Sequence, residues 1–101
     1  MTLVIYEPGT PAIEIIGHAG AAPRGRDPVC AALSILMYTL IDAEKKARIY
    51  QGDGYCRIEA DRFFPTKADG HKGRDAYEIV AGGFRLLAEN YPRYVRFEVK
   101  R

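Results

Sequence analysis

The stretch DPVCAALSILMYTLIDAEKK, residues 27–46, carries the clearest structural signal in the chain. Asp27 is a favourable helix N-cap, because its carboxylate can accept a backbone N–H from two or three residues further on. Pro28 suits the first helical position, where its missing N–H costs nothing. The residues that follow are apolar around most of the helix circumference until charged residues begin at Asp42. We therefore predict a helix that begins after Asp27 and is largely buried.

Short β-prone segments lie on both sides of this helix. Residues 3–6 and 12–17 are apolar and are separated by a turn rich in proline and glycine. Residues 47–51 and 55–60 flank the sequence Gly-Asp-Gly, which is a strong turn signal between two strands. Each pair of segments is predicted to form a β-hairpin.

The C-terminal third predicts a second helix and a last strand. Residues 74–91 place apolar side chains at helical spacing and end before Pro92, whereas residues 66–73 are polar and are predicted to form a mobile surface loop. Residues 93–100 alternate charged and apolar side chains, as an outer strand does. The resulting order is β-β-α-β-β-α-β. It predicts an α+β two-layer sandwich in which two helices pack on one mostly antiparallel sheet of about five strands.

Length and composition predict a single soluble domain and argue against membrane proteins and nucleic-acid-binding proteins. The 101 residues fit one domain, and the hydrophobic share of 48% with a charged share of 28% is typical of a soluble globular chain. The sequence contains no apolar run long enough to span a bilayer and no secretory signal, so we expect a cytoplasmic protein without a membrane partner. The net charge of +2, with acidic residues interrupting the basic clusters, argues against direct binding of nucleic acid.

The two cysteines and two histidines do not form a paired zinc-ligand motif, so we expect neither a metal nor another cofactor. Without a signal sequence, the cysteines are expected to be free thiols. Cys56 lies in a predicted strand and is expected to be structural. His71 lies in the predicted polar loop and is expected to be solvated.

Cys30 and His18 are the residues that suit nucleophilic catalysis. Cys30 falls in the first turn of the predicted helix, where unpaired N–H groups and the helix dipole favour a negatively charged thiolate. His18 follows the second predicted strand, and the intervening segment, with two glycines and two prolines, can bring the imidazole back to the sulfur. The simpler alternative is that Cys30 is a core residue and His18 a surface residue.

A resemblance to a known family favours the catalytic interpretation. The chain resembles the ribosomal-processing cysteine protease family, Prp, in which a Gly-His pair precedes a flexible loop and an Asp-x-x-Cys-x-x-x-Ser helix start. The similarity is looser over the last helix and strand, and the chain departs from the family pattern at Pro28 and in residues 21–24. The matching residues are Gly17, His18, Ala19, Gly25, Asp27, Val29, Cys30, Ala31, Ala32 and Ser34.

This resemblance implies a homodimeric endopeptidase with a Cys-His dyad, formed by one cysteine-protease-like domain over residues 1–101. Its substrate would be a protein or peptide, namely the precursor of large-subunit ribosomal protein twenty-seven, whose N-terminal extension it would remove, or another protein with a similar motif. Cys30 would be the nucleophile and His18 the general base and acid, with Gly17, Asp27 and Ser34 as supporting residues. Asp27 is either a helix cap or a third catalytic member. Ser34 donates either to His18 or to a backbone carbonyl.

Two further expectations concern the reaction itself. The N–H groups at the start of the helix are expected to stabilise the oxyanion, and residues 19–26 are expected to close over a bound peptide. The alternatives to a protease are a non-catalytic ribosome-associated or protein-binding module of the same fold and a thiol-dependent hydrolase of small esters or amides. A binding module has no chemical need for both His18 and Cys30, so their presence favours the protease.

Overall fold

The structure is a computed structural model that describes residues 1–23, 25–61 and 68–101. Its elements occur in the predicted order β-β-α-β-β-α-β. They are β1 (Thr2–Glu7), β2 (Ala12–Gly17), α1 (Pro28–Ala43), β3 (Arg48–Gly52), β4 (Tyr55–Glu59), α2 (Ala68–Asn90) and β5 (Val95–Val99).

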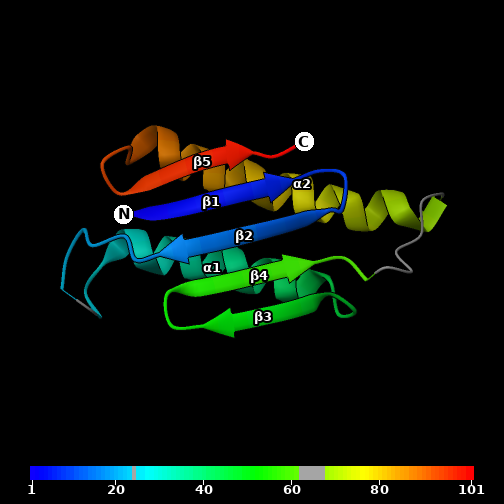
Figure 1. Cartoon of the computed structure of the whole chain (residues 1–101), viewed down its shortest axis with the longest axis horizontal. Coiled ribbons are helices and arrows are strands. Elements are labelled where there is room, and N and C mark those ends of the chain that lie inside the picture. The colour runs from blue at the N-terminus through cyan, green and yellow to red at the C-terminus, as the bar shows by residue number, and fades with distance from the viewer. Residues whose placement is uncertain (24, 62–67) are drawn as a thin grey trace.

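The five strands form one mixed sheet with the order β3-β4-β2-β1-β5. Neighbouring strands are antiparallel, except that β1 and β5 are parallel. Both helices lie on the same side of this sheet (Figure 1). The predicted α+β two-layer sandwich is therefore confirmed, and the C-terminal strand lies at a sheet edge as expected.

The core lies between the sheet and the helix layer. Alternate residues of the central strands point into it, including Val4, Ile13 and Ile58, none of which is exposed. Phe84 of α2 packs against them and is also fully buried. The apolar residues around the last strand join the same core, because Val95 is only 1% exposed and its neighbours Tyr94 and Phe97 pack against the cluster.

The opposite face of the sheet carries charged side chains that pair across strands. Arg57 of β4 contacts Glu7 of β1 at 2.6 Å and Glu59 of its own strand at 3.2 Å. Tyr55 donates its hydroxyl to Glu14 of β2, which is the largest cause of the raised pKa of Tyr55. No described helix covers this face of the sheet (Figure 1). Charged and polar residues from three strands occupy it and pair with one another.

Two expectations about the helices are wrong. Helix α2 begins at Ala68 rather than at residue 74, so residues 68–73 are helical and His71 lies on a helix instead of in a loop. The other two residues of that predicted loop, 66 and 67, lie outside the described residues. Helix α1 is also less buried than predicted, because Ile35 and Tyr38 are 64% and 55% exposed. Within the described ranges, neither helix is long and apolar enough to cross a membrane.

Helices α1 and α2 approach each other closely at Gly83. A Cβ atom built on Gly83 would lie 2.7 Å from Cδ2 of Leu36 on α1, whereas one built on Gly82 meets nothing within 4 Å. Gly83 thus leaves room for the side chain of the neighbouring helix, and Gly82 has no such packing role.

We predict that alanine stabilises the fold more at one of these two neighbouring positions than at the other. Gly82→Ala should raise the free energy of unfolding by about 0.5–1 kcal/mol, because alanine is the better helix former and has space there. Gly83→Ala has the same gain in propensity but must displace the end of the Leu36 side chain, so its net gain should be smaller or absent. Urea unfolding should therefore give a higher free energy of unfolding for Gly82→Ala than for Gly83→Ala. Equal stabilisation by both substitutions would contradict this close helix contact.

Candidate active site

The candidate active site lies at the end of the sheet where β2 stops. The loop after β2 and the turn between β3 and β4 both lie at this end (Figure 1). The N–H of Gly17 donates to the carbonyl of Gly54 at 2.7 Å and joins the two segments. Gly17 has a φ of 91°, and a Cβ there would lie 2.5 Å from the carbonyl oxygen of Met1, so only glycine fits without rearrangement.

Two adjoining cavities bring His18, Cys30 and Ser34 together. One has a volume of 220 Å³ and lies between α1 and the sheet, and the other has a volume of 530 Å³ and lies beneath the loop. All three residues line both cavities, although His18 and Cys30 are twelve positions apart in sequence. The loop between β2 and α1 therefore brings His18 and Cys30 to the same two cavities.

The smaller cavity has a largely apolar wall. Ile15 of β2 and Leu33 and Met37 of α1 line it, with Gln51 of β3 as a polar neighbour. Cys30, Ser34 and Met37 are spaced three to four residues apart along α1, so they share one face of the helix, and all three line this cavity. Helical spacing identified the shared face of α1, but the contribution of Gln51 depends on strand order and could not be read from the sequence.

His18 extends towards solvent and has an acidic neighbour that the sequence analysis did not identify as part of the site. Its side chain is 66% exposed, and Nε2 lies 3.7 Å from Oδ1 of Asp53, which is 97% exposed. So exposed a pair contributes little to stability and exists as an ion pair only when the imidazole is protonated. The sequence marked Asp53 as a turn residue. Only the pairing of β2 with β4, in which Ile16 lies opposite Tyr55, brings that turn beside His18.

Asp27 is the N-cap of α1, as the sequence predicts. Oδ1 accepts from the N–H groups of Val29 and Cys30 at 2.9 and 3.0 Å. Oδ2 accepts from two loop N–H groups, those of Ala21 at 2.9 Å and Ala22 at 3.4 Å. The bond from Cys30 is the largest cause of a pKa for Asp27 below its ordinary value of 3.8.

The same bonds correct the expectation about the oxyanion. Pro28 has no N–H, those of Val29 and Cys30 donate to the Asp27 side chain, and that of Ala31 donates to the Asp27 carbonyl at 3.0 Å. The first turn of α1 therefore has no unoccupied N–H group to offer a substrate oxygen. An oxyanion at Cys30 requires donors from another segment.

The two cysteines are free thiols in different surroundings. Cys30 is half-buried and lines both cavities, whereas Cys56 of β4 is 5% exposed, belongs to the core and lines only the smaller cavity, which fits the structural role expected for it. Burial raises the pKa of the Cys56 thiol. Ser34 makes no hydrogen bond to a described residue, so neither of its predicted partners is observed.

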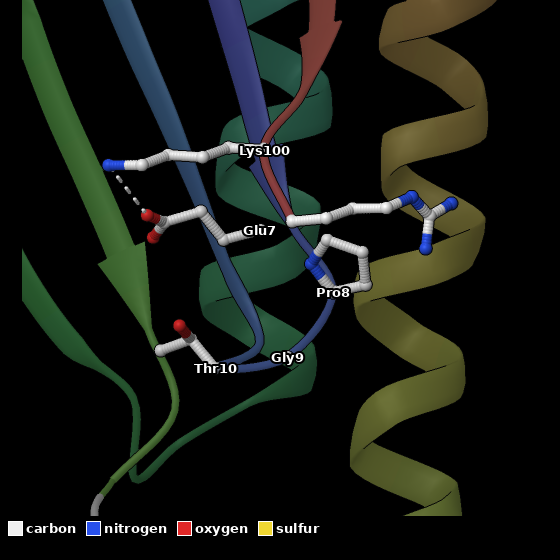
Figure 2. Close-up of a pocket in the computed structure, with 6 residues that line it drawn as sticks. Glu7, Pro8, Gly9, Thr10 and Lys100 are labelled. Carbon is white, nitrogen blue, oxygen red and sulfur yellow. Dashed lines mark ion pairs between the residues drawn. The ribbon is translucent and has the colours of Figure 1, made fainter.

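A third cavity, of 530 Å³, lies at the other end of the sheet and lacks a nucleophile. It is formed around the β1–β2 turn and the C-terminus, where Lys100 pairs with Glu7 at 3.6 Å (Figure 2). Its lining contains no cysteine or histidine. Across the described ranges, His, Cys, Asp and Glu side chains also form no group of three or more that could hold a metal ion.

Comparison with known proteins identifies the class of this site. Residues 7–96 match the family described as cysteine protease Prp. The chain therefore belongs to this family of cysteine proteases, which are hydrolases, and the resemblance seen in the sequence is confirmed. A search of curated proteins gives no significant match.

Solved structures share the fold over nearly the whole chain. The ribosomal processing protease Prp from S. aureus with a covalently linked product peptide has 21% identity and a TM-score of 0.85, covering 99% of this chain and 100% of that one. The same protease with a substrate peptide has 18% identity and a TM-score of 0.78, with the same coverage. SMU.848 from Streptococcus mutans has 28% identity and a TM-score of 0.68, covering 97% of this chain and 90% of that one.

We predict that Asp27 contributes stability that is lost in acid. Because its pKa is lower in the folded chain, this contribution is complete above the unfolded pKa of 3.8 and disappears as the pH falls through the folded value. Urea unfolding of the wild type and Asp27→Asn should differ near neutral pH, and the difference should shrink towards about pH 2. A difference that does not change with pH would contradict the hydrogen bonds assigned to the carboxylate.

The two thiols should also react at different rates. Iodoacetamide at neutral pH should label Cys30 at least about ten-fold faster than Cys56, because Cys56 is buried and its raised pKa keeps it protonated. His18→Ala should slow only the reaction of Cys30, while Asp53→Asn, which keeps the imidazole, should leave it nearly unchanged. Peptide mass spectrometry measures both rates. Equal labelling of the two cysteines would count against an activated Cys30.

Proposed function

We propose that this cysteine protease uses Cys30 and His18 as a catalytic dyad. The observation that carries the proposal is that both side chains line the same two cavities, one of them covered by the loop that joins these residues. Cys30 lies in the first turn of α1, where the helix dipole favours a thiolate. Residues 1–101 act as one catalytic domain in this proposal.

The proposed reaction is hydrolysis through an acyl-enzyme. His18 takes the proton of Cys30, and the sulfur attacks the scissile carbonyl to form a tetrahedral intermediate. The carbon–nitrogen bond then breaks as His18 protonates the departing amine. Water, deprotonated by His18, attacks the thioester, releases the acid product and restores the Cys30 thiol.

The oxyanion donors in this scheme come from the loop. Ala19 and Gly20 line the larger cavity together with Cys30, and their N–H groups make no hydrogen bond to a described residue. Backbone N–H groups in such positions are the usual donors to a tetrahedral oxyanion. The first turn of α1 is excluded from this role because its N–H groups donate to Asp27.

The proposed substrate is the precursor of large-subunit ribosomal protein twenty-seven, from which the enzyme removes an N-terminal extension, or another protein with a similar motif. Family membership supports this choice, and the S. aureus relative is described as an essential ribosomal processing protease bound to a substrate peptide. The cavity beside Cys30 has an apolar wall that suits an apolar side chain next to the scissile bond. We place this reaction in the cytoplasm, where ribosomal precursors are made.

We further infer that the enzyme works as a homodimer. The resemblance to the Prp family supports this inference. Apolar side chains that a monomer leaves in solvent are also present, among them Ile35 and Tyr38 on α1 and Ile79 and Leu86 on α2. Together these residues provide surface that a second copy can cover.

Peptide cleavage tests the proposal. The wild type should cut a peptide spanning the extension of the ribosomal precursor at one position, whereas Cys30→Ser should bind the peptide without cutting it, and mass spectrometry identifies the products. Cys56→Ala is the matched control and should remain active, because it removes the other thiol without placing an unpaired hydroxyl in the core. Cleavage by Cys30→Ser would contradict the assigned nucleophile. Binding without cleavage by the wild type would indicate a binding module instead.

A further inference from the structure

Asp27 makes more hydrogen bonds than a helix cap requires. A cap needs one side-chain oxygen for the N–H groups of the first turn, and Oδ1 alone fills this role for Val29 and Cys30. Oδ2 accepts from Ala21 and Ala22, which precede Asp27 by six and five residues. The second oxygen therefore bonds to the loop rather than to the helix.

This bonded part of the loop forms a wall of the cavity above Cys30. Ala22 lines the cavity directly, as do Ala19 and Gly20 immediately before Ala21. Gly20 and Gly25 line the same cavity and have φ values of 70° and 85°, in the region that favours glycine. The position of the Asp27 carboxylate thus affects the shape of the space in which a peptide would lie.

The other described contacts around Ala21 and Ala22 do not tie their backbone to the start of α1. Ala19 is 3% exposed and belongs to the core, and Ala21 packs against the same core with a single methyl group. Arg26 donates its N–H to the carbonyl of Pro23, but this bond lies within the loop itself. For Ala21 and Ala22, the only hydrogen bonds that link their backbone to α1 within the described ranges end on Asp27.

We propose that Asp27 is a positioning residue that clamps Ala21 and Ala22 to the start of α1 through Oδ2 and so fixes the wall of the cavity above Cys30. The consequence for peptide binding rests on the proposed protease function, whereas the clamp itself is a property of the fold. A carboxylate suits this task because it has only acceptors and can receive four N–H groups at once.

Serine at position 27 separates the clamp from the cap. Its single hydroxyl oxygen is as good an N-cap acceptor as a carboxylate, but it provides no second oxygen for the loop. Alanine removes both functions. Comparing Asp27→Ser with Asp27→Ala therefore distinguishes a residue that holds the loop from one that only starts the helix.

Amide hydrogen exchange followed by NMR is the direct test. In Asp27→Ser, exchange at Ala21 and Ala22 should accelerate at least about ten-fold, while Val29 and Cys30 stay within about three-fold of the wild type. In Asp27→Ala, all four amides should exchange faster. If Ala21 and Ala22 exchange in Asp27→Ser at the same rate as in the wild type, the clamp is overturned, because other contacts would then be holding the loop.

Peptide cleavage adds a second measurement, the KM for the peptide, which a loss of helix capping alone would not change in this way. With the cap kept, Asp27→Ser should raise KM several-fold and leave kcat within about three-fold of the wild type, because it loosens the wall and leaves Cys30 in place. An unchanged KM in a variant whose loop amides have lost protection would overturn the positioning role. If the wild type cleaves no peptide, the proposed function fails, and the exchange experiment still decides whether the clamp exists.

Discussion

Four backbone N–H groups converge on the carboxylate of Asp27, and the geometry around Cys30 depends on them. Two come from the first turn of α1 and set where the helix begins, and two come from the loop after β2. The nucleophile of the proposed dyad and the wall of its cavity therefore share one anchor. The same bonds occupy the N–H groups of the helix start, so these groups do not donate to a substrate oxygen.

The position of His18 is fixed mainly by the backbone. Its pair with Asp53 is too exposed to hold the ring firmly. The end of β2 is instead joined to the β3–β4 turn by the bond from Gly17 to Gly54, and a Cβ on Gly54 would lie 3.2 Å from Nε2 of His18. Glycine at these two positions thus leaves space for the chain and for the imidazole.

The sequence predicted local features well because they depend on neighbouring residues. Asp27 and Pro28 marked the helix start, and the hairpins followed from their turn residues. His18 and Cys30 line the same cavities because the short connection between strand and helix reverses the chain locally.

Features that depend on distant segments could not be predicted in this way. Asp53 and Gln51 join the site only through the pairing of β4 with β2 and β3. The second helix extends back to Ala68 across Gly70 and Gly73, which are poor helix formers, so local propensity placed its start too late. Ile35 is exposed because the sheet and α2 cover only part of the circumference of α1.

The central claim is that Cys30 forms a covalent acyl intermediate with its peptide substrate. Rapid quenching in acid during turnover, followed by intact-mass and peptide mass spectrometry, measures this directly. The account predicts a transient mass increase equal to the acyl half of the peptide, located on Cys30 in the wild type. Peptide cleavage without any adduct on Cys30, or with the adduct on Cys56, would contradict it.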